Sequence, residues 1–193
     1  HLDPVLDSLQ AALRTATAPP PVSSGFFSFL STPARPSEAA EAEVATLLLC
    51  VGHAASRASP SLLLPRAETL ASASLIQPAR EARGATLKAS AAAAFELFAA
   101  AMHAAAQPEA GSEAAAAAVA ASARGLEGRN EMVEVSLKFL EEQAVLTADE
   151  LRPLRRSCFA ACALLVALQP PPPPALCSAL LRAVVEQTRA APD

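Results

Sequence analysis

The sequence of 193 residues contains no tryptophan or tyrosine and only two lysines, six glycines and four cysteines. So few cysteines exclude a disulfide-dense small protein, and so few glycines exclude a collagen-like repeat. The aromatic side chains on which single-stranded nucleic acids stack are limited to seven phenylalanines. A formal net charge of −4 is also a poor electrostatic match for a protein whose whole surface binds nucleic acid.

Alanine is the most abundant residue, with 49 copies, and hydrophobic residues make up 52% of the chain. This length and composition favour one domain with a buried core and exclude a wholly disordered chain. The excess of arginine, alanine and proline over lysine, asparagine and isoleucine is typical of a GC-rich genome. The chain begins at His1. It is therefore expected to be a processed protein, for example one without its organellar transit peptide, or a piece of a longer one.

Apolar residues recur at helical spacing along most of the chain. Val44, Leu47, Leu48 and Val51 follow the i, i+3, i+4, i+7 pattern, and Ser37 is a suitable cap for their helix. No run is typical of a strand. The pattern predicts about eight helices: from Asp3 to near Thr15, from Ser37 to Ser59, from Pro60 or Pro65 through Leu75, from Pro78 to about Gln107, Ala114 to Ala123, a segment capped by Asn130, Thr147 to Leu168 with an irregularity at Pro153, and Ala175 to Arg189.

The predicted helices pair as hairpins joined by short turns that proline or glycine marks. Because no hairpin can bury its apolar stripe alone, we expect an all-α fold of stacked αα-hairpins, a short α-solenoid. An irregular helical bundle is the alternative. The expected organisation is an N-terminal helix with a Pro/Phe-rich connector arm over 1–36, followed by a helical-repeat domain over 37–193.

The connector contains three of the seven phenylalanines, within the segment 25–30. A linker without a structural role would not need them. We therefore predict that Phe26, Phe27, Phe29 and Leu30 pack either onto the helical body or onto another chain, and we take them as candidate partner-docking residues.

Residues suited to metal binding or catalysis form weak patterns. Cys50 and His53, and Cys158 and Cys162, can each share a helix face, but cysteines within apolar stripes are usually small buried hydrophobes. No nucleophile elbow or phosphate-binding glycine loop is present, and the carboxylates between 127 and 150 have the spacing of a solvated helix face. The sequence predicts no metal, no cofactor, no small-molecule substrate and no enzymatic activity.

The most apolar runs are too short or too interrupted to predict a membrane span. The run 158–168 is well below the roughly 20 residues that a transmembrane helix needs. The alanine-rich stretch 89–106 contains Glu96 and His103. Both stretches are expected to be core helices.

A cluster of arginines near a predicted helix start is the best candidate binding site. Arg152, Arg155 and Arg156 stand at i, i+3 and i+4, so they can share a face close to the positive end of the helix dipole. Three guanidinium groups there can hold a phosphate or an acidic partner. The alternative is an ordinary cationic face that pairs with the glutamate-rich helix before it.

Two segments resemble a known class of repeat. The segment 43–53 followed by Pro60-Ser61-Leu62-Leu63-Leu64, and the segment 147–168 followed by 176–180, are similar to units of the organellar helical repeats in FAST-kinase-like and heptatricopeptide proteins. HEAT-like proteins share this α-solenoid class. The resemblance implies an α-solenoid that binds or scaffolds organellar RNA, often as a ribosome-associated subunit.

These observations support three hypotheses about function. The first is a non-catalytic helical-repeat scaffold bound to other subunits of a large organellar assembly, with the mitochondrial ribosome as the leading case and the mitochondrial matrix as the location. The second is an RNA-binding adaptor that uses the basic face of Arg152, Arg155 and Arg156. The third is a protein–protein adaptor, or an accessory subunit of a respiratory or other soluble complex, in another organelle or the cytoplasm.

Overall fold

A computed structural model describes residues 2–18, 37–106, 126–142, 148–168 and 171–190 of the chain. The described part is all-helical and contains no strand, which confirms the predicted class. The pieces α3, η2 and α4 follow one another without a break, so the chain forms seven helices there. The elements are α1 (Asp3–Thr17), α2 (Glu38–Arg57), α3 (Pro60–Thr69), η2 (Leu70–Ile76), α4 (Gln77–Arg80), α5 (Ala85–Ala105), α7 (Leu126–Glu141), α8 (Ala148–Ala167) and α9 (Pro174–Ala190).

Local sequence signals set the starts of the first two helices in different ways. The Ser37 hydroxyl caps α2 as predicted, accepting a hydrogen bond from the Ala40 backbone N–H at 3.2 Å. In α1, Asp3 has a side chain suited to capping, but it does not occupy the cap position. Leu2 occupies the cap position, and Asp3 lies in the first turn. There its carboxylate pairs with Arg66 of α3 at 2.9 Å, so a contact between helices uses the side chain instead.

Pro78 does not open a new helix, which corrects the predicted boundary. The rod from α3 to α4 continues through Pro78 to Arg80, and the next helix, α5, begins at Ala85 after Gly84. A proline lacks an N–H group, and its ring clashes with the carbonyl four residues earlier in an α-helix. The seven residues just before Gln77 form a π-helix, whose wider turns accommodate the ring.

Asn130 was predicted to cap a helix, but it lies inside α7, which begins at Leu126. Its side-chain oxygen accepts hydrogen bonds from Arg129 Nε at 3.2 Å and Nη2 at 3.1 Å. Arg129 is buried and also donates from Nη1 to the Leu168 carbonyl at 3.1 Å. This bond satisfies a carbonyl at the C-terminal end of α8. It therefore attaches the first turn of α7 to the end of α8, and that turn is helical.

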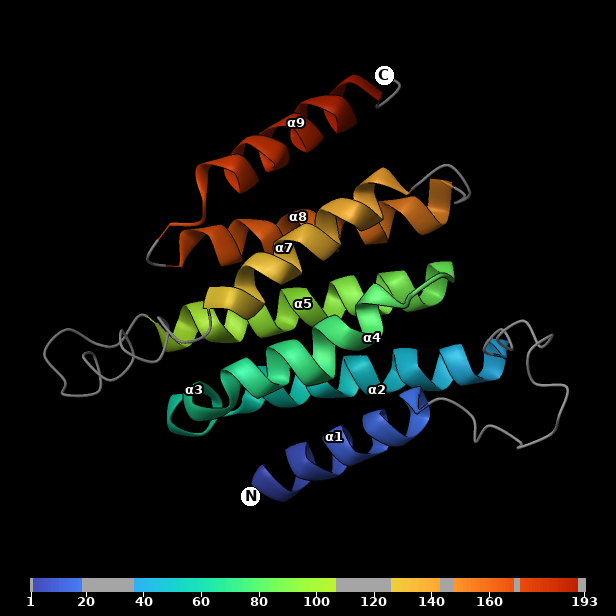
Figure 1. The fold of residues 1–193 in the computed structure, drawn as a ribbon, viewed down its shortest axis with the longest axis vertical. Coiled ribbons are helices and arrows are strands. Elements are labelled where there is room, and N and C mark those ends of the chain that lie inside the picture. The colour runs from blue at the N-terminus through green and yellow to red at the C-terminus, as the bar shows by residue number, and fades with distance from the viewer. Residues whose placement is uncertain (1, 19–36, 107–125, 143–147, 169–170, 191–193) are drawn as a thin grey trace, which may run out of the picture.

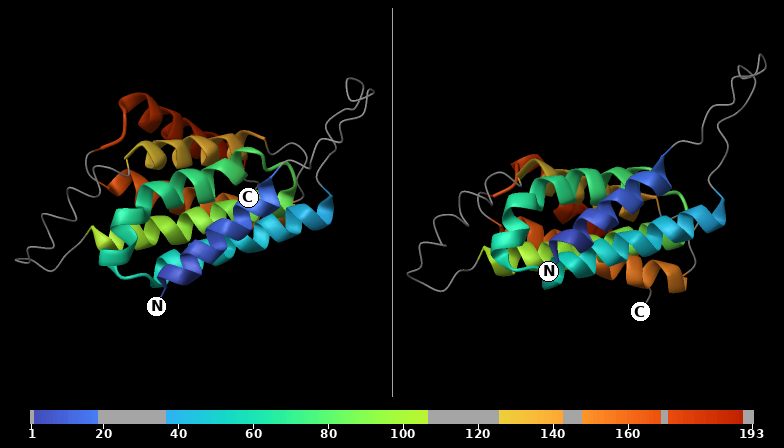
Figure 2. Two further views of the ribbon diagram at one scale, coloured as in Figure 1. Left: turned by 60° about the horizontal axis from the view of Figure 1, so that its bottom comes forward. Right: turned by 90° about the horizontal axis from the view of Figure 1, so that it is seen from below.

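The helices form two layers. Helices α2, α5 and α8 lie side by side in one layer, here called the α5 layer (Figure 1). Helix α1, the α3–α4 rod, α7 and α9 make the other, the α7 layer, as the view from below shows (Figure 2). Successive helices run in alternate directions and alternate between the layers. Helix α1 shares one hydrophobic core with the helices that follow residue 37, because Leu6 and Leu13 are buried in it.

Helix α5 is the centre of the core, packed between α2 and α8. Phe95 is completely buried, and small residues allow a close approach to α2: a side chain on Gly52 would lie 2.9 Å from the Ala94 Cα. By length and composition alone α5 is also a candidate membrane span, and half of that apolar window is buried inside the protein. Its position in the core accounts for its apolar composition.

Ion pairs connect consecutive helices of the α7 layer and tie that layer to α5. Arg66 of α3 pairs with Asp3 and Asp7 of α1, and Arg80 of α4 pairs with Glu131 of α7. Lys88 of α5 is buried, with its Nζ 2.8 Å from Glu142 and 5.9 Å from the centre of the Phe139 ring. The buried side chain of Lys88 therefore has a carboxylate and an aromatic face as its neighbours.

Candidate partner-binding site

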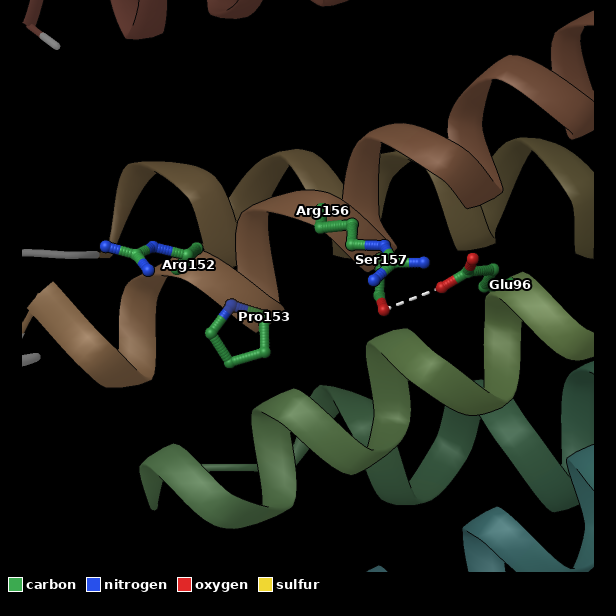
Figure 3. Close-up of a pocket in the computed structure, with 5 residues that line it drawn as sticks. All are labelled: Glu96, Arg152, Pro153, Arg156 and Ser157. Carbon is green, nitrogen blue, oxygen red and sulfur yellow. Dashed lines mark hydrogen bonds between the residues drawn. The ribbon is translucent and has the colours of Figure 1, made fainter.

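The candidate site is an open pocket between α8 and α5. Its volume is about 400 Å³, and four of its five lining residues come from the first half of α8, with the fifth from α5 (Figure 3). The lining residues are Glu96, Arg152, Pro153, Arg156 and Ser157. The pocket therefore includes two of the three arginines that the sequence predicts as a binding site.

Helix geometry explains which arginines meet. Arg152 and Arg156 are one helical turn apart, and both are exposed (Figure 3). Arg155 is half-buried, does not line the pocket and is engaged in an interaction of its own. The structure thus brings together Arg152 and Arg156 and leaves Arg155 beside them.

A hydrogen bond between the two helices forms one wall of the pocket. The Ser157 hydroxyl donates to Glu96 Oε2 at 2.7 Å, and Arg156 lies beside this bond (Figure 3). The sequence analysis treated Glu96 only as an interruption of an alanine-rich stretch and did not single out Ser157. The two residues are 61 positions apart, so no local spacing predicts their contact.

The pocket carries two positive charges and one negative charge. Within the described residues, neither Arg152 nor Arg156 forms an ion pair. Among the described residues of the glutamate-rich helix and its end, Glu131 pairs with Arg80 and Glu142 pairs with Lys88 and Lys138, so neither carboxylate pairs with Arg152 or Arg156. Two exposed guanidinium groups one turn apart suit a carboxylate or phosphate group on a partner.

Pro153 lies between the two arginines, and α8 continues through it. Its missing N–H leaves the carbonyl of Asp149, in the first turn, without the usual helical donor. The adjacent Leu154 is completely buried. The core contact therefore holds α8 in place at the proline, and the two arginines keep their helical spacing.

The cysteines do not join the pocket or a metal site. Cys158 and Cys162 are buried in the core, Cys50 is exposed on α2, and no group of three or more metal-ligating side chains occurs among the described residues. Burial raises the pKa of the Cys158 thiol and raises that of Cys162 to about 11. Both thiols are therefore protonated at neutral pH and unreactive as nucleophiles.

Several sequence predictions fall on residues that the structure does not describe. The candidate docking residues Phe26, Phe27, Phe29 and Leu30 lie outside the described residues. The predicted helix 114–123 and Thr147, the predicted start of the helix that ends at Leu168, also lie outside them. These remain predictions from the sequence.

No family model, curated protein or solved structure matches the chain. The resemblance to organellar helical repeats therefore stays a prediction from the sequence.

Proposed function

We propose that this protein is a non-catalytic helical scaffold that binds other proteins of a larger assembly. The observation that carries the proposal is the pocket of Arg152 and Arg156. These two exposed cations form no ion pair in the described part of the chain, although other charged residues there pair between helices. An acidic group on a partner would neutralise their positive charges.

A short α-solenoid is the architecture that we propose for this scaffold. Its support is the alternation of successive helices between the α5 layer and the α7 layer, with neighbours in each layer in contact. Stacked hairpins of this kind leave extended outer surfaces available for partners. The Arg152–Arg156 pocket lies on such a surface, between two neighbouring helices of the α5 layer.

The test is co-sedimentation of the tagged chain with large complexes in a gradient of lysate from source cells. We expect the unaltered chain to sediment with an assembly, and the double variant Arg152→Glu/Arg156→Glu to shift toward the free fraction. Arg14→Glu/Arg57→Glu makes the same charge change at exposed sites on α1 and α2 and should leave sedimentation unchanged. A wild-type chain that sediments alone would refute the scaffold proposal.

The assembly that we propose to test first is the mitochondrial ribosome, in the matrix. This choice is supported by the sequence resemblance to organellar helical repeats. Fractionation of organelles followed by the same gradient tests it. Co-migration with a ribosomal subunit is expected, whereas co-migration with a respiratory complex or a cytoplasmic complex would favour the adaptor hypotheses.

Direct RNA binding through Arg152 and Arg156 is the second candidate function. The same unpaired guanidinium groups favour it, and the carboxylate of Glu96 in the pocket opposes it. Fluorescence anisotropy of a labelled single-stranded RNA at several salt concentrations tests it. Each phosphate contact contributes a slope of roughly −0.7 in log affinity against log salt, so removing both arginines should reduce the slope by about 1.4. No binding, or a slope unaffected by the double variant, would eliminate this function.

A further inference from the structure

The chain passes from α8 to α9 through a run of prolines. Residues 170–174 are five consecutive prolines, and the structure describes Pro171 to Pro174, here called the polyproline segment. The segment lies at one end of the two helices that it joins (Figure 1). A single proline is enough to end an α-helix. The run is therefore longer than the turn between the helices requires.

The backbone of the polyproline segment has one available conformation. A proline fixes its own φ near about −65°, and it restricts the residue before it to an extended ψ of about +120 to +160°. Pro171, Pro172 and Pro173 meet both conditions, because each is a proline followed by another proline. The segment is therefore a short polyproline II helix, with three residues per turn.

The three residues of a turn place the proline rings on three edges. Pro172 is buried, so its edge faces the protein, whereas Pro171, Pro173 and Pro174 are exposed. Pro171 and Pro174 share an edge because they are three residues apart, and Pro173 occupies the remaining one. Two of the three edges are therefore open to a partner.

Contacts at both ends hold the polyproline segment in place. Before it, Leu168 is buried, and its carbonyl accepts a hydrogen bond from Arg129 Nη1 at 3.1 Å. After it, the Pro173 carbonyl accepts hydrogen bonds from the backbone N–H groups of Leu176 at 3.0 Å and Cys177 at 3.2 Å. A partner that binds this segment therefore has little conformational entropy to remove.

The chain around the polyproline segment offers rings and carbonyl groups rather than charge. The sequence has no charged residue from 168 to 181. Protein domains that recognise such segments do so with grooves lined by aromatic side chains, as SH3, WW and EVH1 domains do with PxxP sequences. Pro171 and Pro174 have the PxxP spacing.

We propose that the polyproline segment docks into the aromatic-lined groove of a partner domain that recognises polyproline II helices. The aromatic side chains of the domain pack on the exposed rings of Pro171, Pro173 and Pro174, while Pro172 stays against its own chain. This surface is separate from the pocket of Arg152 and Arg156, because eleven residues, roughly 16 Å of helix, lie between Arg156 and the end of α8 at Ala167. The inference goes beyond the proposed function and does not depend on it.

The test uses purified SH3, WW and EVH1 domains that carry tryptophan in their grooves. This chain has no tryptophan, so all the tryptophan fluorescence of a mixture comes from the domain. Titration with the full chain should change the fluorescence of at least one domain to saturation, and a synthetic polyproline peptide should reverse the change by competing for the groove. Binding to none of the three domains, or binding that the peptide does not displace, would overturn the proposal.

A pair of alanine variants tests the rings themselves. Pro171→Ala/Pro173→Ala should weaken binding at least tenfold. Each new alanine still precedes a proline, so the backbone stays extended and the loss reports the missing rings. Pro60→Ala/Pro65→Ala removes two exposed prolines from α3 and should bind as the unaltered chain does. Unchanged binding by Pro171→Ala/Pro173→Ala would overturn the proposal.

The arginine variant separates this surface from the proposed scaffold function. Arg152→Glu/Arg156→Glu should bind the domain as the unaltered chain does, and a loss of binding would place the contact in the pocket and overturn the proposal. If the chain sediments alone in the gradient but binds the domain through its prolines, the scaffold function is wrong and the docking segment stands. If it sediments with an assembly and binds none of the domains, the docking segment is wrong and the scaffold function stands.

Discussion

Helices α5 and α9 both have large apolar residues at helical spacing, but their surroundings are opposite. Helix α5 lies between α2 and α8, and Leu87, Phe95, Phe98 and Met102 are all buried. Helix α9 packs against α7 on one side, and none of its described side chains is fully buried. Its leucines Leu176 and Leu180 are half-buried against the core. Apolar spacing thus predicts that a helix has a contact face, whereas the neighbours decide whether that face is covered.

Helices α5 and α9 also differ in how closely they pack against their neighbours. Small residues bring the backbones of α2 and α5 close together, as at Gly52 and Ala94. Between α7 and α9 the structure leaves a pocket of about 160 Å³ lined by charged, polar and apolar residues, including Glu141, Arg182 and Glu186. Helix α5 is therefore packed more closely against α2 than α9 is against α7.

Truncating a large side chain on each helix should show this difference most strongly. Phe95→Ala removes a completely buried ring, and we expect it to lower the free energy of unfolding by about 3–5 kcal/mol. Leu181→Ala, on α9, should change it by less than about 0.5 kcal/mol, because the side chain is largely solvated. Urea unfolding followed by circular dichroism measures both. Similar losses would mean that α9 is covered by its own chain.

The close approach of α2 and α5 makes the next prediction. Gly52→Ala places a methyl group 2.9 Å from the Ala94 Cα and 3.2 Å from its carbonyl oxygen, so the helices must shift. Overpacking costs about 1–3 kcal/mol, and the better helix propensity of alanine returns about 1, so we expect a net loss of about 1 kcal/mol.

Ala42→Gly supplies the control for Gly52→Ala. Ala42 is exposed on the same helix, so urea unfolding of this variant measures the propensity difference without a packing change. If Gly52→Ala were more stable than the unaltered protein by the propensity difference that Ala42→Gly measures, α2 and α5 would be further apart than the structure shows.

Acid should weaken the link between α5 and α7. The hydrogen bond from Lys88 lowers the pKa of Glu142 below its ordinary 4.5, so the pair stabilises the folded state above pH 4.5 and loses that contribution as the pH falls through the lowered value. Because Glu142 is 44% exposed, the contribution is small, at most about 1 kcal/mol. In thermal melting between pH 3 and 7, the melting temperature of Glu142→Gln should fall less toward low pH than that of the unaltered protein.

Glu134→Gln is the matched control, since Glu134 is exposed on α7, the helix that ends just before Glu142, and takes part in no ion pair among the described residues. Its melting temperature should fall toward low pH as much as that of the unaltered protein. If the fall were reduced equally in both variants, the pH dependence would come from the loss of any negative charge and not from the pair with Lys88.

The sequence predicts burial and helix starts best where residues within one helix determine them. The run 158–168 was predicted to be a core helix, and Cys158, Cys162 and Leu165 are buried there, because the 3.6-residue period places them on one face. The start of α2 at Ser37 follows from cap chemistry in the same local way.

The failures arise where distant segments override local signals. Asn130 has cap chemistry, but Arg129 bonds to the end of α8, 39 positions away, and the helix extends past the cap. Pro78 has a helix-start signal, but the π-helix before it absorbs the ring. In the candidate site, helical spacing brought Arg152 and Arg156 together, whereas the Glu96–Ser157 bond depends on how α5 and α8 pack.

Another small effect concerns a polar atom in the contact between α7 and α8. Ser136 is completely buried on α7, and its hydroxyl has no hydrogen-bond partner in the part of the chain that the structure describes. Replacing an unsatisfied buried hydroxyl with hydrogen removes a desolvation cost, so Ser136→Ala should raise the free energy of unfolding, by up to about 1 kcal/mol. Ser157→Ala removes a hydroxyl that does bond, to Glu96, and should lower it by about 1 kcal/mol. Urea unfolding of the two serine variants thus has opposite expected signs, and a loss of stability in Ser136→Ala would show that its hydroxyl is satisfied in solution.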